Sequence, residues 1–318
     1  MARSIHRPKT KMRAKIPRVG ILHFGTTTSD MLGPEPRHSS TAAFLDGMRE
    51  LGYLYGRDFL TEPRGGEGKP ELWPRQAAEL TRLRVDVIVA AGPNLLTLTR
   101  TTSTIPIVMA AGDPLGDAFV QSLNRPGANI TGLTLQETDT TGKRLELLKE
   151  LVPSSGPVAV LWTNTTRSSP QYLRAAEAAA RSRGWRLVTF EVRAPSEIES
   201  AFRAATAAHA SALLDLATGV TFARAREVAQ LAARSRLPAM YDLRAYVEAG
   251  GLIAYGADIR AIWRRSATFV KKILSGAKPG DLPIEQPTKL ELVINRETTK
   301  TLGLTIPPTL LLQAEVID

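Results

Sequence analysis

The chain has 318 residues, enough for about two domains, and its 43% apolar and 23% charged residues are typical of globular proteins. It contains no cysteine, which excludes disulfide bonds, thiolate metal ligands, thiol catalysis and lipid attachment at a cysteine. No apolar run approaches the roughly 18 residues that would indicate a membrane-spanning helix.

The net charge of +10 comes mostly from residues 1–18, which carry seven lysines and arginines and no acidic residue. Without these seven, the chain has 34 basic and 31 acidic residues and is nearly neutral. We therefore expect residues 1–17 to be a basic disordered tail, and no nucleic-acid partner. The apolar segment of a signal peptide is not visible in this stretch.

Short apolar runs alternate with amphipathic stretches along the first half of the chain. This pattern predicts buried parallel strands at 18–25, 58–62, 85–91, 105–109 and 130–134, and helices at 40–51, 71–83 and 94–100. Ser40 or Thr41 is the expected N-cap of the first helix, and Gly52 is expected to end it.

The second half repeats this pattern. Strands are expected at 157–164, 187–192, 212–217, 237–241 and 252–255, and helices at 169–183, 197–208 and 222–235, the first with Ser169 as its N-cap and Pro170 as its first residue. In both halves a glycine and an aromatic residue follow the first helix, and a proline begins the fourth strand. The repeat predicts two doubly wound, Rossmann-like α/β lobes.

The C-terminal region is expected to add to these lobes. A helix at 259–274 completes one lobe in this interpretation, and a strand and helix follow at 291–302. The tail, 305–318, is apolar and is expected to pack against the protein.

Three segments carry a family resemblance: AGDPLGDAFVQSLNRPGANITGLT (111–134), RLPAMYDLRAYVEAGGLIAYGADI (236–259) and ILSGAKPGDLPIEQPTKLELVINRETTKTLGLTIPPTLL (273–311). From about Arg18 to its C-terminus, the chain resembles the solute-binding components of a widespread group of bacterial ABC transporters, some of which are linked to tryptophan or other aromatic amino acids. The resemblance implies a type I periplasmic-binding fold, with two lobes, three crossing strands and a ligand in the cleft. It does not imply a particular ligand.

The resemblance also implies a periplasmic location, although relatives carry a signal peptide or a lipoprotein cysteine before the first strand, where this sequence has MARSIHRPKTKMRAK. The implied lobes are 18–131 plus 256–284, and 132–255 plus 285–318. Hinge crossings are expected near 131–135, 253–256 and 283–288, where Gly132 and Gly256 would ease changes in the backbone.

Open α/β sheets bind ligands at the carboxyl ends of their strands. In this chain those ends are rich in glycine, threonine and asparagine, whose N–H and hydroxyl groups suit a carboxylate or another anion. The expected ligand-binding residues are Thr26, Thr27, Gly92, Asn94, Gly112, Asp113, Asn164, Thr165, Thr218, Gly219, Tyr241, Arg244 and Tyr255.

Several of these residues have a second interpretation. Asp113 could accept a hydrogen bond from a ligand ammonium group, or it could cap a turn before Pro114. Arg244 could bind a ligand carboxylate, or it could pair with Glu248 one helical turn further on. Tyr241 and Tyr255 could stack on a ligand, or they could belong to the core.

The sequence predicts no catalytic residue, metal site or cofactor. Its four histidines lack metal-ligand spacing, and His23, inside the first strand, is interpreted as a core residue. Neither a nucleophile elbow nor a Walker loop is present.

The predicted function is that of a monomeric solute-binding component of an ABC importer. It would bind a small molecule, an amino acid-like or aromatic carboxylate, and deliver it to a permease by domain closure. An enzyme built of two α/β lobes and the ligand-sensing domain of a regulator are the alternatives. The regulator would need a DNA-binding helix pair ahead of the first strand, and residues 1–17 show no apolar period.

Overall fold

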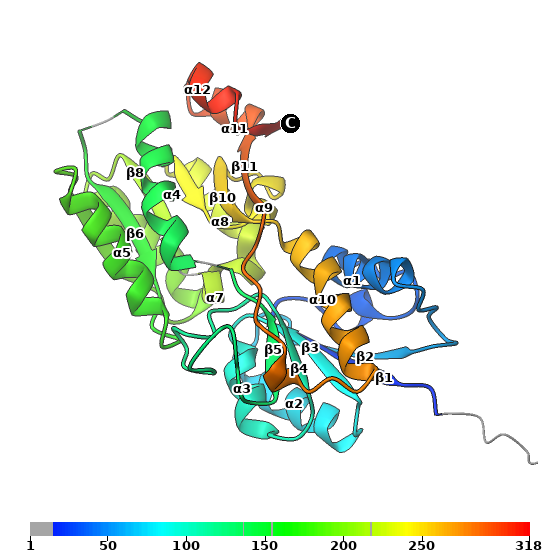
Figure 1. Ribbon diagram of the computed structural model, residues 1–318. Helices are drawn as coiled ribbons and strands as arrows, with labels where there is room; N and C mark the ends of the chain where they lie inside the picture. The colour runs from blue at the N-terminus through cyan, green and yellow to red at the C-terminus, as the bar shows by residue number, and fades with distance from the viewer. Residues whose placement is uncertain (1–14, 136, 154, 217) are drawn as a thin grey trace, which may run out of the picture.

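Two α/β lobes make up the protein (Figure 1). The computed structural model describes residues 15–318 apart from 136, 154 and 217. Most of the tail expected at 1–17 lies outside the described residues. The two lobes are built on separate sheets, so each is described from its own strands.

The first lobe has a five-stranded parallel sheet. Its strand order is β2 (Leu60–Gly65), β1 (Arg18–His23), β3 (Val87–Ala91), β4 (Ile107–Ala110) and β5 (Ile130–Leu133). Its helices are α1 (Ser39–Glu50), α2 (Trp73–Arg82), α3 (Asn94–Thr101) and α10 (Ile259–Leu274). The order 2-1-3-4-5 is that of a doubly wound sheet.

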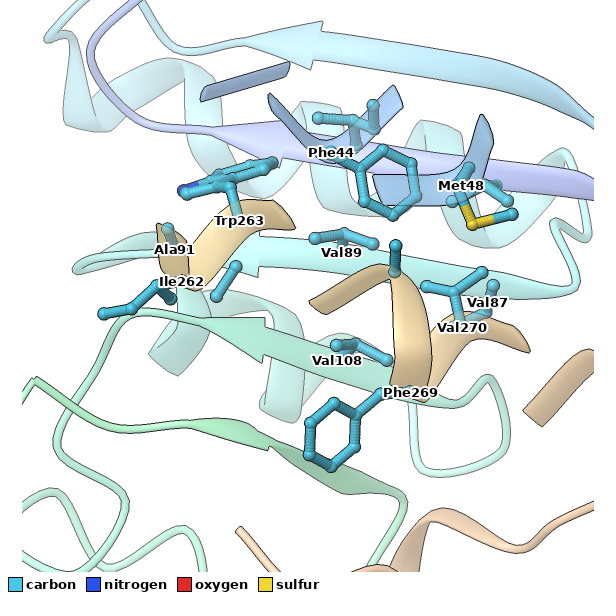
Figure 2. Close-up of a cluster of buried hydrophobic side chains, with 14 of the residues drawn as sticks. Phe44, Met48, Val87, Val89, Ala91, Val108, Ile262, Trp263, Phe269 and Val270 are labelled. Carbon is cyan, nitrogen blue, oxygen red and sulfur yellow. The ribbon is translucent and has the colours of Figure 1, made fainter. Parts of the chain in front are cut away.

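Alternate side chains of the central strands enter two different cores, because successive residues of a strand point to opposite faces. Val87 and Val89 of β3 face the layer of α1 and α10, where Phe44 and Trp263 are fully buried (Figure 2). Ile88 faces the other layer, which is formed by α2 and α3. Helix α10 therefore completes the first lobe, as the sequence predicts.

The second lobe has a seven-stranded sheet. Its order is β7 (Leu187–Glu191), β6 (Val158–Trp162), β8 (Ala212–Leu216), β9 (Ala239–Tyr241), β10 (Ile253–Ala257), β11 (Leu290–Asn295) and β12 (Glu315–Ile317). The first five strands repeat the order of the first lobe, in agreement with the repeat seen in the sequence. Strand β11 runs antiparallel to β10 and parallel to β12.

Helices cover both faces of this second sheet. They are α4 (Glu137–Leu151) and α5 (Ser169–Arg181) on one face and α6 (Ile198–Ala207), α8 (Ala225–Arg234) and α9 (Arg244–Glu248) on the other, with α7 (Thr218–Thr221), α11 (Arg296–Thr301) and α12 (Pro308–Leu311) as short elements. In the apolar tail Leu310 is buried, but Leu311 and Leu312 are exposed, so only part of the tail packs as expected.

The expected N-caps are wrong by one to three positions. The N-cap of α1 is His38, and Ser40 and Thr41 lie buried inside the helix. The N-cap of α5 is Ser168 rather than Ser169. A run of several hydroxyl residues offers alternative caps, and the sequence pattern does not choose between them.

The chain passes between the lobes after β5, after β10 and before β11. The first and third passages lie side by side, since Glu285 N–H donates to the carbonyl of Gly132 at 2.9 Å and Thr134 N–H donates to the carbonyl of Glu285 at 3.0 Å. The boundaries expected at 131/132 and 255/256 fall inside β5 and β10. We propose that the lobes meet just beyond those strands, at 134–135 and at Asp258, and at 286–289 on the third passage.

Gly132 is required by the close approach of β5 to β4. Its φ is +130°, and a Cβ there would lie 2.1 Å from the carbonyl oxygen of Met109. We expect Gly132→Ala to lower the free energy of unfolding by about 2–4 kcal/mol, through backbone strain and overpacking.

Urea denaturation measures this effect, and Gly142→Ala in α4 is the matched control. A Cβ at Gly142 would meet only the Cβ of Ala179, at 3.6 Å, so this change should raise stability by about 0.5–1 kcal/mol. Equal stability of the two variants would contradict the close approach at Gly132.

Candidate functional site

A cavity of about 130 Å³ lies between the lobes. This volume is roughly ten times the minimum that one water molecule needs. It is lined from one lobe by residues that follow β1, β3 and β4, and from the other by residues that follow β6, β8 and β9. The strand ends that the sequence points to therefore converge on one place, as expected for parallel sheets.

Six of the predicted ligand-binding residues line this cavity: Gly92, Gly112, Asp113, Thr165, Thr218 and Gly219. Two of these glycines let the backbone pass close to neighbouring side chains. A Cβ at Gly92 would lie 2.6 Å from the ring of Phe24, and one at Gly112 would lie 2.7 Å from the sulfur of Met109. Their role in binding stays a prediction.

The other predicted residues do not line the cavity; they are Thr26, Thr27, Asn94, Asn164, Tyr241, Arg244 and Tyr255. The two threonines bond elsewhere: the carbonyl of Thr26 accepts from Glu67 N–H, in the loop after β2, at 3.0 Å, and Thr27 Oγ1 donates to Asp30 at 2.6 Å. Asn164 is exposed.

Arg244 takes the alternative role considered from the sequence. It pairs with Glu248 at 2.9 Å, with Glu291 at 3.4 Å and with both oxygens of Glu315 at 2.6 and 2.7 Å. These hydrogen bonds raise the pKa of Arg244 well above its ordinary value, since Glu315 and Glu248 favour its charged form. Arg244 thus joins α9 to β11 and β12.

The two tyrosines and Asn94 are core residues. Tyr241 is fully buried and stacks on Tyr246 with ring centroids 4.6 Å apart. Tyr255 packs with the core on the α4 face of the sheet. Asn94 is fully buried, and within the described part of the chain neither of its amide atoms has a hydrogen-bond partner.

Aromatic residues that the sequence analysis passed over form part of the cavity wall. Phe24 of the first lobe and Phe222 of the second are in contact, with ring centroids 5.3 Å apart. His23 stacks on Phe24 at 5.0 Å, and Trp263 lies 5.8 Å from His23. Phe24 directly follows β1, so the expectation that ligands bind at strand ends could have identified it. Trp263 lies on α10, far away in the sequence, and no strand end points to it.

Two aspartates join the lobes beside the cavity. Ser168 N–H, at the start of α5, donates to Asp117 Oδ1 at 2.9 Å, and the hydroxyl of Tyr172 donates to Asp113 Oδ2 at 3.2 Å. Asp113 also accepts from Gly116 N–H at 2.9 Å, so it caps a turn and also lines the cavity. Burial raises the pKa of Asp117, with a further contribution from the charge of Asp113.

Two buried hydrogen-bond donors of the cavity wall have no partner within the described residues. They are the hydroxyl of Thr163, at the end of β6, and the indole N–H of Trp263, on α10. Thr163 is 3% exposed and Trp263 is fully buried. An unsatisfied buried polar group costs about 1–3 kcal/mol, so both groups favour a ligand that supplies a partner.

His23, buried on the cavity lining, pairs with the half-buried His38, and their ring centroids are 4.4 Å apart. Burial lowers the pKa of His23 well below its ordinary value, and the neighbouring His38 lowers it further. Burial lowers the pKa of His38 to about 4, partly opposed by the charge of Asp30. Both rings are therefore neutral at pH 7, and Gly25 N–H donates to His23 Nδ1 at 3.1 Å.

Within the part of the chain that the structure describes, no group of three histidine, aspartate or glutamate side chains could hold a metal ion. Among the same residues, every helix is too short or too polar to cross a membrane.

Comparison with known proteins assigns a family and a fold. The model of a family described as ABC transporter substrate binding protein matches residues 33–317. A tyrosine-binding protein of Clostridioides difficile is 22% identical over 263 residues, which are 82% of this chain and 75% of that protein.

Two solved structures share the fold over 96% of this chain and all of theirs, at 24% identity. A conserved domain protein from Vibrio cholerae has a TM-score of 0.85. An ABC domain from Streptococcus pneumonia, in complex with L-Trp, has a TM-score of 0.84. At this identity the likeness shows the fold alone, which is that of the type I periplasmic-binding proteins.

The histidine pair predicts a loss of stability in mild acid. The unfolded chain protonates His38 near pH 6.5, but the folded chain does so only near pH 4, so acid favours the unfolded state between these values. We expect the free energy of unfolding to fall by about 2 kcal/mol from pH 7 to pH 5 on account of His38 alone.

Thermal melts at pH 7, 6 and 5 test this expectation with His38→Asn, since asparagine suits the N-cap position that His38 holds. The variant should lose less stability on acidification than the unmodified protein. His209→Asn, at an exposed site on the second lobe, is the control and should follow the unmodified protein. Parallel curves for all three proteins would contradict the assignment.

Proposed function

This chain belongs to the family of ABC transporter substrate-binding proteins, and we propose that it binds a small aromatic amino acid in the cavity between its lobes. As a member of that family it is the substrate-binding component of a transporter and not an enzyme. The ligand, its delivery to a permease by domain closure, a monomeric state and a periplasmic location are parts of the proposal.

The contact between Phe24 and Phe222 carries the proposal for the ligand. The two rings come from opposite lobes, and both line the cavity. With His23 and Trp263 they offer several ring faces and edges to one ligand, and each aromatic contact contributes about 0.5–1.5 kcal/mol beyond its buried area.

The polar part of the cavity suits the amino acid backbone. Three residues with hydroxyl groups, Thr163, Thr165 and Thr218, line the cavity, and so do the carboxylate residues Asp113 and Asp117. Small pockets of this kind, largely apolar with a few placed polar groups, are typical ligand sites. The relatives support the proposal, since one is named tyrosine-binding and another was solved with L-Trp.

A thermal-shift panel tests the ligand class. L-Tryptophan, L-tyrosine or L-phenylalanine at about 100 times its Kd should add about 2.7 kcal/mol of stability, because it binds only the folded state. Glucose and divalent metal ions should give no shift. A shift with sugars alone would refute the proposed ligand class.

Phe222→Ala should then weaken binding of the responding amino acid at least about tenfold, since it removes a ring of the cavity wall. Phe190→Ala is the matched control, because Phe190 lies on β7 of the same lobe and does not line the cavity. Calorimetric titration measures both variants. Equal losses would show that Phe222 acts only through the stability of its lobe.

Domain closure is supported by the direct bonds between the lobes. Asp117 and Asp113 of the first lobe accept from Ser168 and Tyr172 of the second. A ligand that touches both lobes binds the closed arrangement better and shifts the population toward it. A permease that docks both lobes would then recognise the occupied protein.

Small-angle scattering with and without saturating L-tryptophan tests closure. We expect the radius of gyration to fall when ligand is added. An unchanged radius in a sample that calorimetry shows to be saturated would contradict closure as the response to ligand.

A further inference from the structure

The cavity carries an unbalanced charge. Asp113 and Asp117 line it, and among the described lining residues there is no lysine or arginine. The one basic group on the lining is His23, and burial keeps it neutral at pH 7. The fixed charge that a ligand meets in this cavity is therefore negative.

Neither Asp113 nor Asp117 forms an ion pair with a basic side chain of the described chain. Asp113 accepts from Gly116 N–H and from the Tyr172 hydroxyl, and Asp117 accepts from Ser168 N–H. All of these donors are neutral. A carboxylate offers about four acceptor positions, so both have capacity left for a further donor.

Two partly buried carboxylates on one cavity lining, with no cation beside them, are unfavourable. A positively charged group of the ligand would offset that cost and would form charge-assisted hydrogen bonds, the strongest kind available here.

The carboxylate of an amino acid has no positively charged partner among the described lining residues. The two unsatisfied donors of the wall, Thr163 Oγ1 and Trp263 Nε1, are neutral. Figure 2 shows the ring of Trp263 beside Ala91, at the carboxyl end of β3, and both residues line the cavity. Neutral donors bind a carboxylate less strongly than an arginine does.

We propose that this cavity selects its ligand by an ammonium group held at Asp113 and Asp117, and that the ligand carboxylate contributes less to affinity than the ammonium group does. This inference rests on the proposed function, because it takes the ligand to be a small aromatic molecule in this cavity. The class of ligand is then the aromatic primary amine, of which aromatic amino acids are one kind.

Three probes that share one ring separate the two ends of the ligand: L-tryptophan, tryptamine, which lacks the carboxylate, and indole-3-propionate, which lacks the ammonium group. Calorimetric titration of the full chain at pH 7 should give tryptamine a Kd within about fivefold of L-tryptophan, and indole-3-propionate a Kd at least about thirtyfold weaker, as loss of a charged hydrogen bond implies.

The outcomes are distinguishable. If L-tryptophan and indole-3-propionate bind while tryptamine does not, the ammonium proposal is overturned and the proposed function stands. If none of the three probes binds and the other aromatic amino acids also fail, the proposed ligand class falls, and this inference falls with it.

Asp113→Asn and Asp117→Asn test the named carboxylates. Each should weaken L-tryptophan and tryptamine about tenfold or more, and leave indole-3-propionate unchanged or tighter, because the change removes a negative charge. An equal loss for all three probes, or no loss for any, would overturn the assignment. Asp46→Asn, an exposed site paired with Arg49, is the control.

Discussion

One geometric constraint underlies the cavity: all strands of a parallel sheet end at the same edge. Both sheets here turn the carboxyl ends of their parallel strands toward each other, so loops from distant parts of the chain meet in one place. The charges, rings and hydroxyl groups of the site need no long loops to reach one another. Their positions follow from the strand order, which both lobes share.

Much of the fold could be predicted from sequence, because buried parallel strands leave a strong local pattern. The run VDVIVAA gave β3 to within two residues, and the helix at 259–274 was placed at its observed bounds. Strand-end glycines pointed to Gly92, Gly112 and Gly219 on the cavity lining. These predictions needed only the spacing of apolar residues and the positions of the glycines and prolines that begin or end helices and strands.

The side chains that face the cavity were harder to predict, because orientation depends on tertiary packing. Tyr241 and Phe222 are both aromatic and both lie near strand ends, yet Tyr241 stacks inside the core and Phe222 reaches across to the other lobe. Arg244 is bound by glutamates of β11 and β12, strands far away in the sequence. A local sequence pattern cannot identify partners that lie so far away in the sequence. For the same reason it does not predict that Trp263, on α10, lines the cavity.

Helix α10 belongs to the first lobe but follows nearly all of the second lobe in the chain. As a nascent chain leaves the ribosome, the face of α1 that carries Phe44 and Met48 has no cover until α10 emerges. The 142 residues from Leu133 to Leu274 take roughly 7–28 s to make at 5–20 residues per second. The lobe that is begun first is therefore finished late, and its apolar face is open to chaperones, or to aggregation, throughout that interval.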